Sequence, residues 1–258
     1  MSRSRSLSLA PVLTLTLASF TFAAGPADEP LPKAEAVLAQ YIEATGGKAA
    51  YEALKNRVST GTLEVVGAGV KGTMVITQAA PNKSLTLNDI GAVGKTTQGT
   101  DGDLAWSVSD LTGDRVLDGV EKETTLRQAK FNGELNWKER YEKAECVGVE
   151  DVDGKPAYKV VMTPKTGKPA TQYYDKASHL LVKQTLTTES PMGELSVEAY
   201  PSDYKKSDGV LMPFTLKQKV LTQEIVITMT EVKHNVDLPA DAFAPPDSVK
   251  ALIKKKGK

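Results

Sequence analysis

The stretch that decides the fold is TQYYDKASHLLVKQTLTTESPMGELSVEAYPSDYKKSDGVLMPF, residues 171–214. Apolar and polar residues alternate along it in short runs; for example, Leu195 and Val197 alternate with Ser196 and Glu198. Turn residues such as Asp208-Gly209 separate the runs. A period of two residues is typical of antiparallel strands that bury one face and expose the other. The stretch therefore predicts several strands joined by short polar turns.

The same alternation extends through residues 60–109 before this stretch and through residues 158–230 around it. Counting runs and turns predicts about ten or eleven strands. The twist that accumulates over so many strands curls an open sheet, so the sheet cannot stay flat. We expect an α+β fold: a strongly curved antiparallel sheet, shaped as an incomplete β-barrel, with helices plugging its concave side.

Three segments depart from the strand pattern. Pro32 opens a segment whose apolar residues recur at spacings of three and four, and Gly46-Gly47 ends it. Residues 48–56 predict a second, short helix. Residues 121–140 predict one or two short helices that cross the sheet. These apolar stripes could bind a partner, or they could cover the apolar face of the sheet.

The N-terminus has the features of a signal peptide: Arg3 and Arg5, an apolar run over residues 7–20, and the small residues Ala23 and Ala24. We expect a signal peptide over residues 1–24, a flexible leader over 25–32, one domain over 33–246 and a basic tail over 247–258. Asp247 could cap a short helix in the tail, whose lysines could touch anionic lipid headgroups, or the tail could be a solvated, frayed terminus. Cys146 is the only cysteine, so there is no lipobox cysteine near the cleavage site and no internal disulfide. These features predict a periplasmic protein.

Composition and motifs argue against several classes of function. Lys+Arg and Asp+Glu number 32 each, and aromatic residues make up only 6%, which disfavours a nucleic-acid-binding protein. The segment Gly94-Lys95-Thr96 lacks the remaining glycine and the following helix of a phosphate loop. A hydrolase would need a nucleophile within hydrogen-bonding distance of His179 or His234. We expect no enzyme activity, no cofactor and no metal.

A curved sheet covered by helices can enclose a cavity for an apolar ligand, or side chains can fill it. Met and aromatic side chains adapt to flexible acyl chains. Each candidate could instead simply pack the core. The candidate lining is Leu104, Trp106, Tyr158, Val160, Met162, Leu180, Val182, Leu195, Val197, Phe214, Leu216, Ile227 and Met229.

Several short motifs resemble the outer membrane lipoprotein-sorting family and its LolA-like relatives. They are YIEATGG (residues 41–47), YDK (174–176) with LLVK (180–183), PMGE (191–194), and Asp203-Tyr204 with DGV (208–210) and Pro213. The resemblance spans most of the chain after the signal peptide. It implies an incomplete barrel with helices at its mouth, which holds or shuttles a lipid or an acylated protein in the periplasm without catalysis. It also implies a buried basic residue that gates the cavity, although no motif assigns that role to a residue of this sequence.

Two hypotheses follow from these observations. The first is a periplasmic carrier that holds a lipid or the acyl chains of a lipoprotein in its apolar concavity. The second is an accessory module of the cell envelope whose core is filled and whose outer face docks a protein partner.

Overall fold

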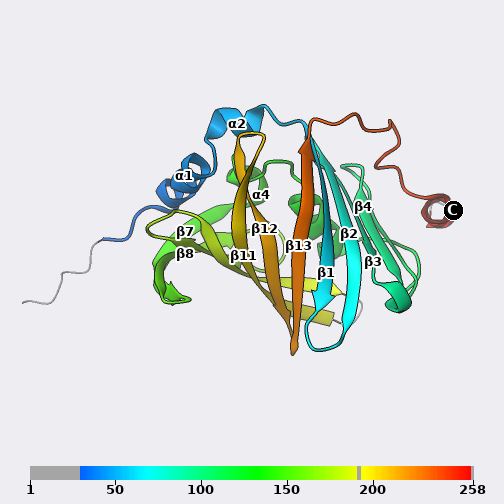
Figure 1. Ribbon diagram of the computed structural model, residues 1–258. Coiled ribbons are helices and arrows are strands. Elements are labelled where there is room, and N and C mark those ends of the chain that lie inside the picture. The colour runs from blue at the N-terminus through cyan, green and yellow to red at the C-terminus, as the bar shows by residue number, and fades with distance from the viewer. Residues whose placement is uncertain (1–29, 191–192, 257–258) are drawn as a thin grey trace, which may run out of the picture. The chain divides into compact units, whose positions relative to one another are not determined.

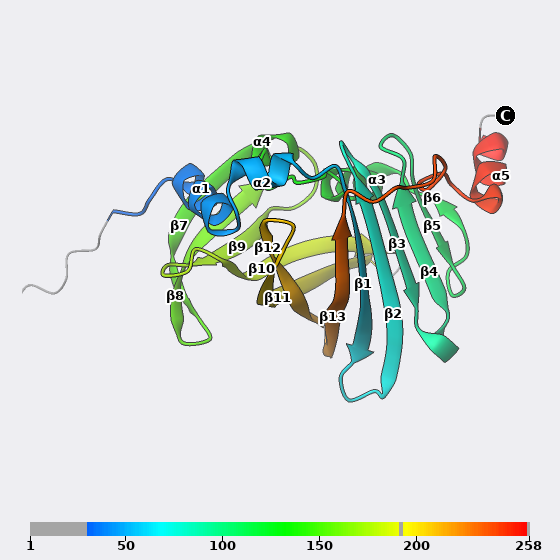
Figure 2. The ribbon, with the colours of Figure 1, turned by 45° about the horizontal axis from the view of Figure 1, so that its top comes forward.

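Thirteen antiparallel strands form one sheet in the order β6-β5-β4-β3-β2-β1-β13-β12-β11-β10-β9-β8-β7 (Figures 1 and 2). The computed structural model describes residues 30–190 and 193–256, so the predicted signal peptide lies outside the described residues. The strands are β1 (Asn56–Val65), β2 (Val70–Ala79), β3 (Lys83–Asp89), β4 (Lys95–Thr100), β5 (Ala105–Ser109), β6 (Arg115–Val116), β7 (Lys143–Val152), β8 (Lys155–Thr163), β9 (Ala170–Asp175), β10 (Leu181–Ser190), β11 (Gly193–Ser207), β12 (Val210–Val220) and β13 (Gln223–His234).

The pairing of β1 with β13 joins two meanders, β1 to β6 and β7 to β13, into one curved sheet. β6 and β7 are the two edges of the sheet, so the barrel is not closed, as predicted. The predicted number of strands was too low. β4 has the sequence KTTQGT and contains no apolar residue, and β6 has only two residues. Neither strand could produce the alternation on which the count depended.

The helices lie where the sequence predicted them. They are α1 (Ala34–Ala44), α2 (Lys48–Glu52), α3 (Gly119–Gln128) and α4 (Trp137–Arg140), with a 3₁₀ turn η1 (Gly91–Val93) before β4. α3 contacts both β5 and β10, which are far apart in the strand order. A helix can reach both strands only by spanning the hollow of a curved sheet, so α3 marks the concave side.

α1 and α2 cover two parts of this concave side. Val37 and Leu38 of α1 pack against Val160 and Met162 of β8, together with Tyr174 of β9. Tyr51 and Leu54, from α2 and the residues after it, pack with Ile42 against Val210, which follows the turn between β11 and β12. The apolar stripes of both helices are therefore buried in the core.

The α1–α2 junction lies directly on the β11–β12 turn. Leu211 N–H donates to the Thr45 carbonyl over 2.8 Å, and the Thr45 hydroxyl is 2.8 Å from the Tyr51 hydroxyl. A Cβ atom on Gly46 would lie 2.4 Å from the Gly209 carbonyl oxygen, and Gly46 has a φ of +130°. Only glycine allows this close approach between the two turns.

The C-terminal segment forms α5 (Asp247–Lys256) rather than a solvated terminus. Val249 is fully buried, and α5 contacts the edge strand β6. Figure 2 shows the chain running from β13 past the ends of the neighbouring strands to α5 beside β5 and β6. Within the described residues, no helix is long and apolar enough to cross a membrane.

Candidate functional site

The strand register identifies the residues of the concave face. The Gln98 side-chain amide of β4 donates to the Thr125 hydroxyl of α3 over 3.0 Å, so Gln98 points toward the concave side. Gln98 pairs with Thr86, Thr86 with Ile76, and Ile76 with Ser59. Paired residues of an antiparallel sheet point to the same face. This row and the residues two positions away on each strand form what we call the concave face.

The concave face is mainly apolar along β10 to β13 and β1. Leu63, Val197 and Ile227 are buried there, and Leu63 and Leu216 pair with Ile227 from either side. The following predicted lining residues lie on this face by register or by strand alternation: Leu195, Val197, Phe214, Leu216, Ile227 and Met229.

The concave face changes character from β2 to β5. Apart from Ile76 and Met74 of β2, most of its side chains there are amides and hydroxyls, and a cavity of about 230 Å³ lies between this part of the face and α3. The lining includes Gln78, Thr86, Gln98 and Thr125. The concave side is therefore mainly apolar on one half and mainly polar but uncharged on the other. Local alternation did not indicate this division.

Three other predicted lining residues lie beneath α1. Tyr158, Val160 and Met162 share one face of β8 and belong to the cluster around Val37 and Leu38. The space that remains between α1, α4 and this part of the sheet is about 20 Å³, enough for about one water molecule. This end of the concavity is filled by protein side chains.

The structure corrects the predicted side of Trp106. Trp106 pairs with Gly99, next to Gln98 on β4, and therefore lies on the outer face of the sheet. Its ring and the Leu85 side chain converge on the space that a Gly99 Cβ atom would occupy. Trp106 is only 2% exposed, because the outer face of this half of the sheet is itself covered. The assumption that the larger apolar residues point inward fails here.

Val182 also lies on the outer face, where it packs against Tyr173 and Val152. A β-bulge between Leu181 and Lys183 shifts the register of β10 against β9, and the sequence gives no sign of it. Lys183 and Glu198 form an ion pair of 2.7 Å on the outer side. Leu104 and Leu180 lie in turns, before β5 and before β10 respectively, rather than in strands.

Arg57 is a partly buried cation at the concave end of β1. It donates to the Gln78 side-chain oxygen, contacts the Met212 sulfur at 3.5 Å, and lies 5.9 Å from the centre of the Phe131 ring. Within the described part of the chain, no carboxylate forms an ion pair with it. Burial lowers the pKa of Arg57, although a guanidinium stays charged at physiological pH. The alternation of Arg57 with Ser59, Gly61 and Leu63 could have placed it on the concave side.

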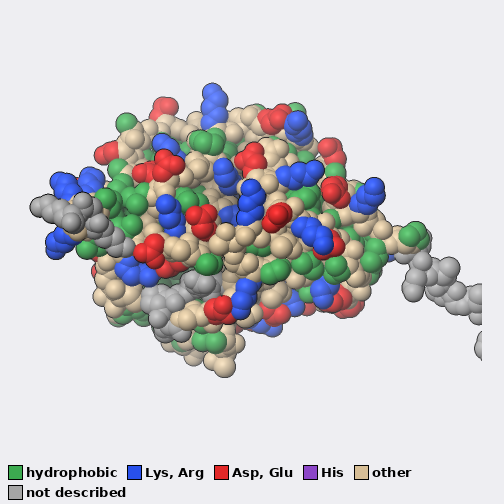
Figure 3. Space-filling view, turned by 180° about the vertical axis from the view of Figure 1, so that it is seen from behind, with side chains coloured by type: hydrophobic (Ala, Val, Ile, Leu, Met, Phe, Trp, Pro, Cys, Tyr) green, Lys and Arg blue, Asp and Glu red, His purple; other side chains and the backbone are tan. Residues whose placement is uncertain are grey.

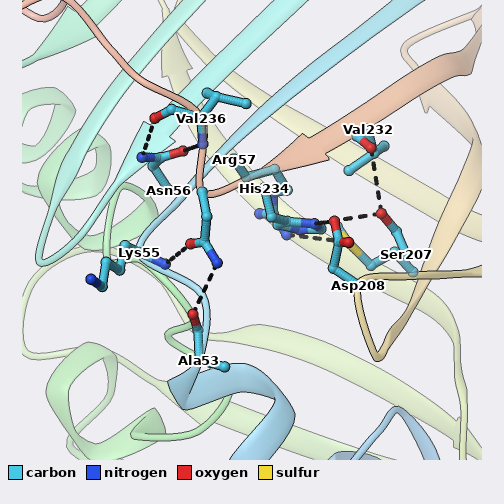
Figure 4. Close-up of polar contacts among 11 residues, drawn as sticks. Ala53, Lys55, Asn56, Arg57, Ser207, Asp208, Val232, His234 and Val236 are labelled. Atoms are coloured by element: carbon cyan, nitrogen blue, oxygen red, sulfur yellow. Dashed lines mark hydrogen bonds and ion pairs between the residues drawn. The ribbon is translucent and has the colours of Figure 1, made fainter.

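His234 is the cross-strand partner of Arg57 (Figure 4). Its Nδ1 atom lies 3.0 Å from Asp208 Oδ2 and 3.4 Å from Ser207 Oγ. Burial lowers the pKa of His234, Asp208 acts in the opposite direction, and the Arg57 charge adds to the lowering.

A serine thus lies within reach of His234, as a hydrolase would require, but the arrangement is not that of a catalytic triad. In a triad the serine contacts one ring nitrogen and the carboxylate contacts the other. Here Ser207 and Asp208 both meet Nδ1, and Nε2 is buried with no hydrogen-bond partner within the described residues. His234 is therefore not a base poised between a nucleophile and an orienting acid. The described residues also contain no group of three or more His, Cys, Asp or Glu side chains able to hold a metal.

Four tyrosines lie around the helices that cover the concave face. Tyr41 and Tyr174 meet edge to face with ring centres 5.4 Å apart, and Tyr204 donates to the Leu181 carbonyl over 2.8 Å. Burial raises the pKa of all four hydroxyls, that of Tyr51 to about 12. They remain neutral hydrogen-bonding groups at physiological pH.

Comparison with solved structures supports the predicted fold. An outer membrane lipoprotein-sorting protein domain from Vibrio parahaemolyticus has a TM-score of 0.57 at 15% sequence identity, covering 86% of this chain and 99% of that one. A LolA superfamily protein from Nitrosomonas europaea has a TM-score of 0.56 at 13% identity, covering 83% and 99%. A DUF1329 family protein from Desulfovibrio piger has a TM-score of 0.56 at 17% identity, covering 84% and 98%.

The chain therefore has the fold of LolA-like proteins, and the resemblance inferred from short motifs is confirmed at the level of structure. At these identities the likeness concerns the fold alone. No family model matches the sequence, and no curated protein matches it either.

Proposed function

We propose that this protein is a periplasmic binding or carrier protein for an acyl-chain ligand, held on the apolar half of the concave face. The observation that supports this most directly is the row of apolar residues that crosses β1, β13 and β12 on the concave face, formed by Leu63, Ile227 and Leu216. Apolar surface on the inside of an incomplete barrel suits an acyl chain, because transferring the chain out of water contributes about 0.8 kcal/mol per buried CH₂. The predicted signal peptide and the LolA-like fold support the assignment to the periplasm.

Arg57 would control access to this face. Its guanidinium is held by Gln78, Met212 and the Phe131 ring, and Phe131 belongs to the segment between α3 and α4. The contacts of Arg57 therefore link β1, β2 and β12 to that segment. Breaking them would loosen the segment, and its remaining bonds, from Phe131 N–H to the Pro81 carbonyl and from the Asn132 amide to the Tyr51 carbonyl, would have to open as well to admit a ligand. Arg57 fits the role of the buried basic residue that the family resemblance implies.

The test compares two neighbouring residues of β12 whose side chains point to opposite faces. Leu216→Gln places an amide on the apolar half of the concave face, whereas Lys217→Gln places the same side chain on the outer face. We expect Leu216→Gln to weaken binding of a fluorescent fatty acid at least tenfold, because an unpaired amide in an apolar site costs about 1–3 kcal/mol. Lys217→Gln should bind like the wild type. If the wild-type protein takes up no fatty acid, and native mass spectrometry finds no co-purified lipid, the proposal is wrong.

A second candidate is an accessory module that docks a protein partner. The filled space beneath α1, only about 20 Å³, favours it at that end of the molecule. A groove of about 440 Å³ on the outer face, floored by Val182, Tyr200 and Val226, provides a surface for such a partner. This candidate predicts that an envelope protein is captured equally well by lipid-free and lipid-loaded protein. Capture that depends on bound lipid would exclude it.

A further inference from the structure

A cleft rich in basic side chains lies against α3 and α4. It has a volume of about 510 Å³, and five basic side chains line it against two acidic ones. Figure 3 views the molecule from the side opposite to Figure 1 and shows Lys and Arg side chains interspersed with Asp and Glu across that side. The basic residues of the cleft are Arg127, Lys130, Lys138, Arg140 and Lys165.

Arg127 and Arg140 are the central pair of this cleft. Both also line an adjoining cavity of about 210 Å³, together with Lys168. Arg127 donates to the Thr166 carbonyl over 3.0 Å and to the Thr124 hydroxyl over 3.3 Å, both of them neutral acceptors. No carboxylate pairs with Arg127 in the described part of the chain. Burial lowers the pKa of Arg127, and the positive charge of Arg140 lowers it further.

The Arg140 side chain is held in place, but not all of its N–H groups have hydrogen-bond partners. Its side chain is only 15% exposed and forms a long ion pair of 3.5 Å with Glu134. Its guanidinium lies 5.4 Å from the centre of the Tyr141 ring, and its Nε atom is buried without a partner among the described residues. Two guanidinium groups at one cleft, with few carboxylates to balance them, favour binding of an anion that accepts several hydrogen bonds at once. Phosphate meets that requirement, because its oxygens accept paired bonds from the fork of an arginine.

The adjoining cavity connects this basic pair to the acyl-binding face. Its lining includes Leu186 and Gln184 of β10. Leu186 pairs with Val197, so it lies on the same concave face as the apolar row. A ligand with a phosphate at the cleft could therefore extend an acyl chain along the concave face toward that row.

We infer that Arg127 and Arg140 bind the phosphate group of the ligand, so that the acyl-chain ligand is a phospholipid. This inference rests on the proposed function for the acyl part of the ligand. The phosphate chemistry would be the same for free phosphate, and the experiment must therefore separate the two sources.

The experiment measures binding of three probes to the purified full-length protein by calorimetry: dioctanoyl phosphatidic acid, dioctanoylglycerol and inorganic phosphate. The first two have the same acyl chains and differ only in the phosphate. We expect the wild-type protein to bind phosphatidic acid at least tenfold more tightly than dioctanoylglycerol, since hydrogen bonds to charged groups contribute about 1.5–3 kcal/mol each. The preference should weaken as salt is added.

The matched variants remove two charges inside or outside the cleft. Arg127→Gln with Arg140→Gln should abolish the preference for phosphatidic acid and leave dioctanoylglycerol binding unchanged. Lys48→Gln with Lys71→Gln removes the same charge at side chains that are 73% and 72% exposed, and should keep the preference. If the loss of Arg140 prevents folding, Arg127→Gln alone should still reduce the preference severalfold.

The outcomes separate this inference from the proposed function. Equal affinity of the wild type for phosphatidic acid and dioctanoylglycerol would overturn the phosphate site and leave acyl binding intact. Binding of inorganic phosphate that depends on Arg127, with no binding of either lipid, would overturn the phospholipid assignment and the proposed function, and would identify a site for free phosphate. If the protein binds none of the three probes, both proposals are wrong.

Discussion

Arg57 and His234 lie directly opposite each other on β1 and β13, where the two meanders of the sheet join. Two basic side chains as cross-strand neighbours on an inward-facing surface would repel each other if both were charged. Burial and the Arg57 charge lower the pKa of His234, so the imidazole is neutral when the pH is neutral. The pair therefore carries one charge, and that charge sits on the residue proposed to control access to the concave face.

A double-mutant cycle between Arg57 and Gln78 should show strong coupling. Arg57→Met leaves the Gln78 oxygen without its donor, and Gln78→Leu leaves the guanidinium without its acceptor. We expect a coupling free energy of about 1–3 kcal/mol from urea unfolding of the four proteins. The control pair, Glu64 and Lys71, is also cross-strand on β1 and β2 but exposed, and should give about 0.2–1 kcal/mol. Equal coupling in both pairs would contradict the contact described here.

The stability of the protein should depend on pH through His234. A histidine whose pKa is lowered by folding contributes stability that is complete above its unfolded pKa of about 6.5 and is lost as the pH falls through its folded pKa. The unfolding free energy of the wild type should therefore exceed that of His234→Gln by an amount that shrinks as the pH falls below about 6.5. Carboxylates other than Asp208 affect both proteins alike, so the difference isolates the imidazole together with its contact to Asp208. A difference that stays constant with pH would show that folding leaves the His234 pKa unchanged.

Gly46→Ala should destabilise the protein more than Gly47→Ala. Both glycines have positive φ, but a Cβ atom at Gly46 would lie 2.4 Å from the Gly209 carbonyl oxygen, whereas at Gly47 its nearest neighbour is the tip of the Glu43 side chain at 3.5 Å. We expect Gly47→Ala to cost about 1–2 kcal/mol from the backbone alone. Gly46→Ala should cost about 1–3 kcal/mol more, because the added methyl group overpacks the contact. Thermal unfolding of the two variants measures the difference, and similar melting temperatures would mean that the two turns separate easily.

Trp106→Ala and Met229→Ala should separate stability from binding. Trp106 is buried on the outer face, so its loss should destabilise the protein by about 3–5 kcal/mol without changing fatty-acid affinity. Met229 is only partly buried and pairs with Gly61 on the concave face, so its loss should weaken fatty-acid binding. Titration of the folded variants at low temperature measures affinity, and urea unfolding measures stability. A loss of affinity in Trp106→Ala that matches the loss in Met229→Ala would mean that the ligand lies elsewhere.

The sequence predicted the curved sheet and its helices because alternation and turns are local signals. It did not predict which face of the sheet each alternating side chain points to. On β5, Trp106 and Ser107 alternate clearly, but both faces of this strand are covered: α3 contacts β5 on the concave side, and Trp106 on the outer side is only 2% exposed. Ser107 is the residue that points to the concave side. Only its pairing with Gln98, and that of Trp106 with Gly99, reveals this. Pairing depends on contacts between distant segments, which local periodicity does not contain.

In the candidate site, too, local alternation predicted some residues, and contacts between distant segments determine the others. Leu216 and Ile227 could be assigned to a lining from their alternation, and the structure pairs them. Arg127 and Arg140 lie in a stretch with weak periodicity, where no local pattern distinguishes a cleft arginine from a solvent-exposed one. They line one cleft only because α3 and α4 fold against the loop between β8 and β9.

The contact between Gly46 and Gly209 also bears on how the concavity could open. At the contact between Gly46 and Gly209 backbone meets backbone, so no side-chain rotation at this point could release the α1–α2 junction from the β11–β12 turn. The hydrogen bond from Leu211 to Thr45 joins the same two segments. The two segments should therefore move as a single rigid flap, and the hinge for ligand entry should lie elsewhere, in the longer segment between α3 and β7.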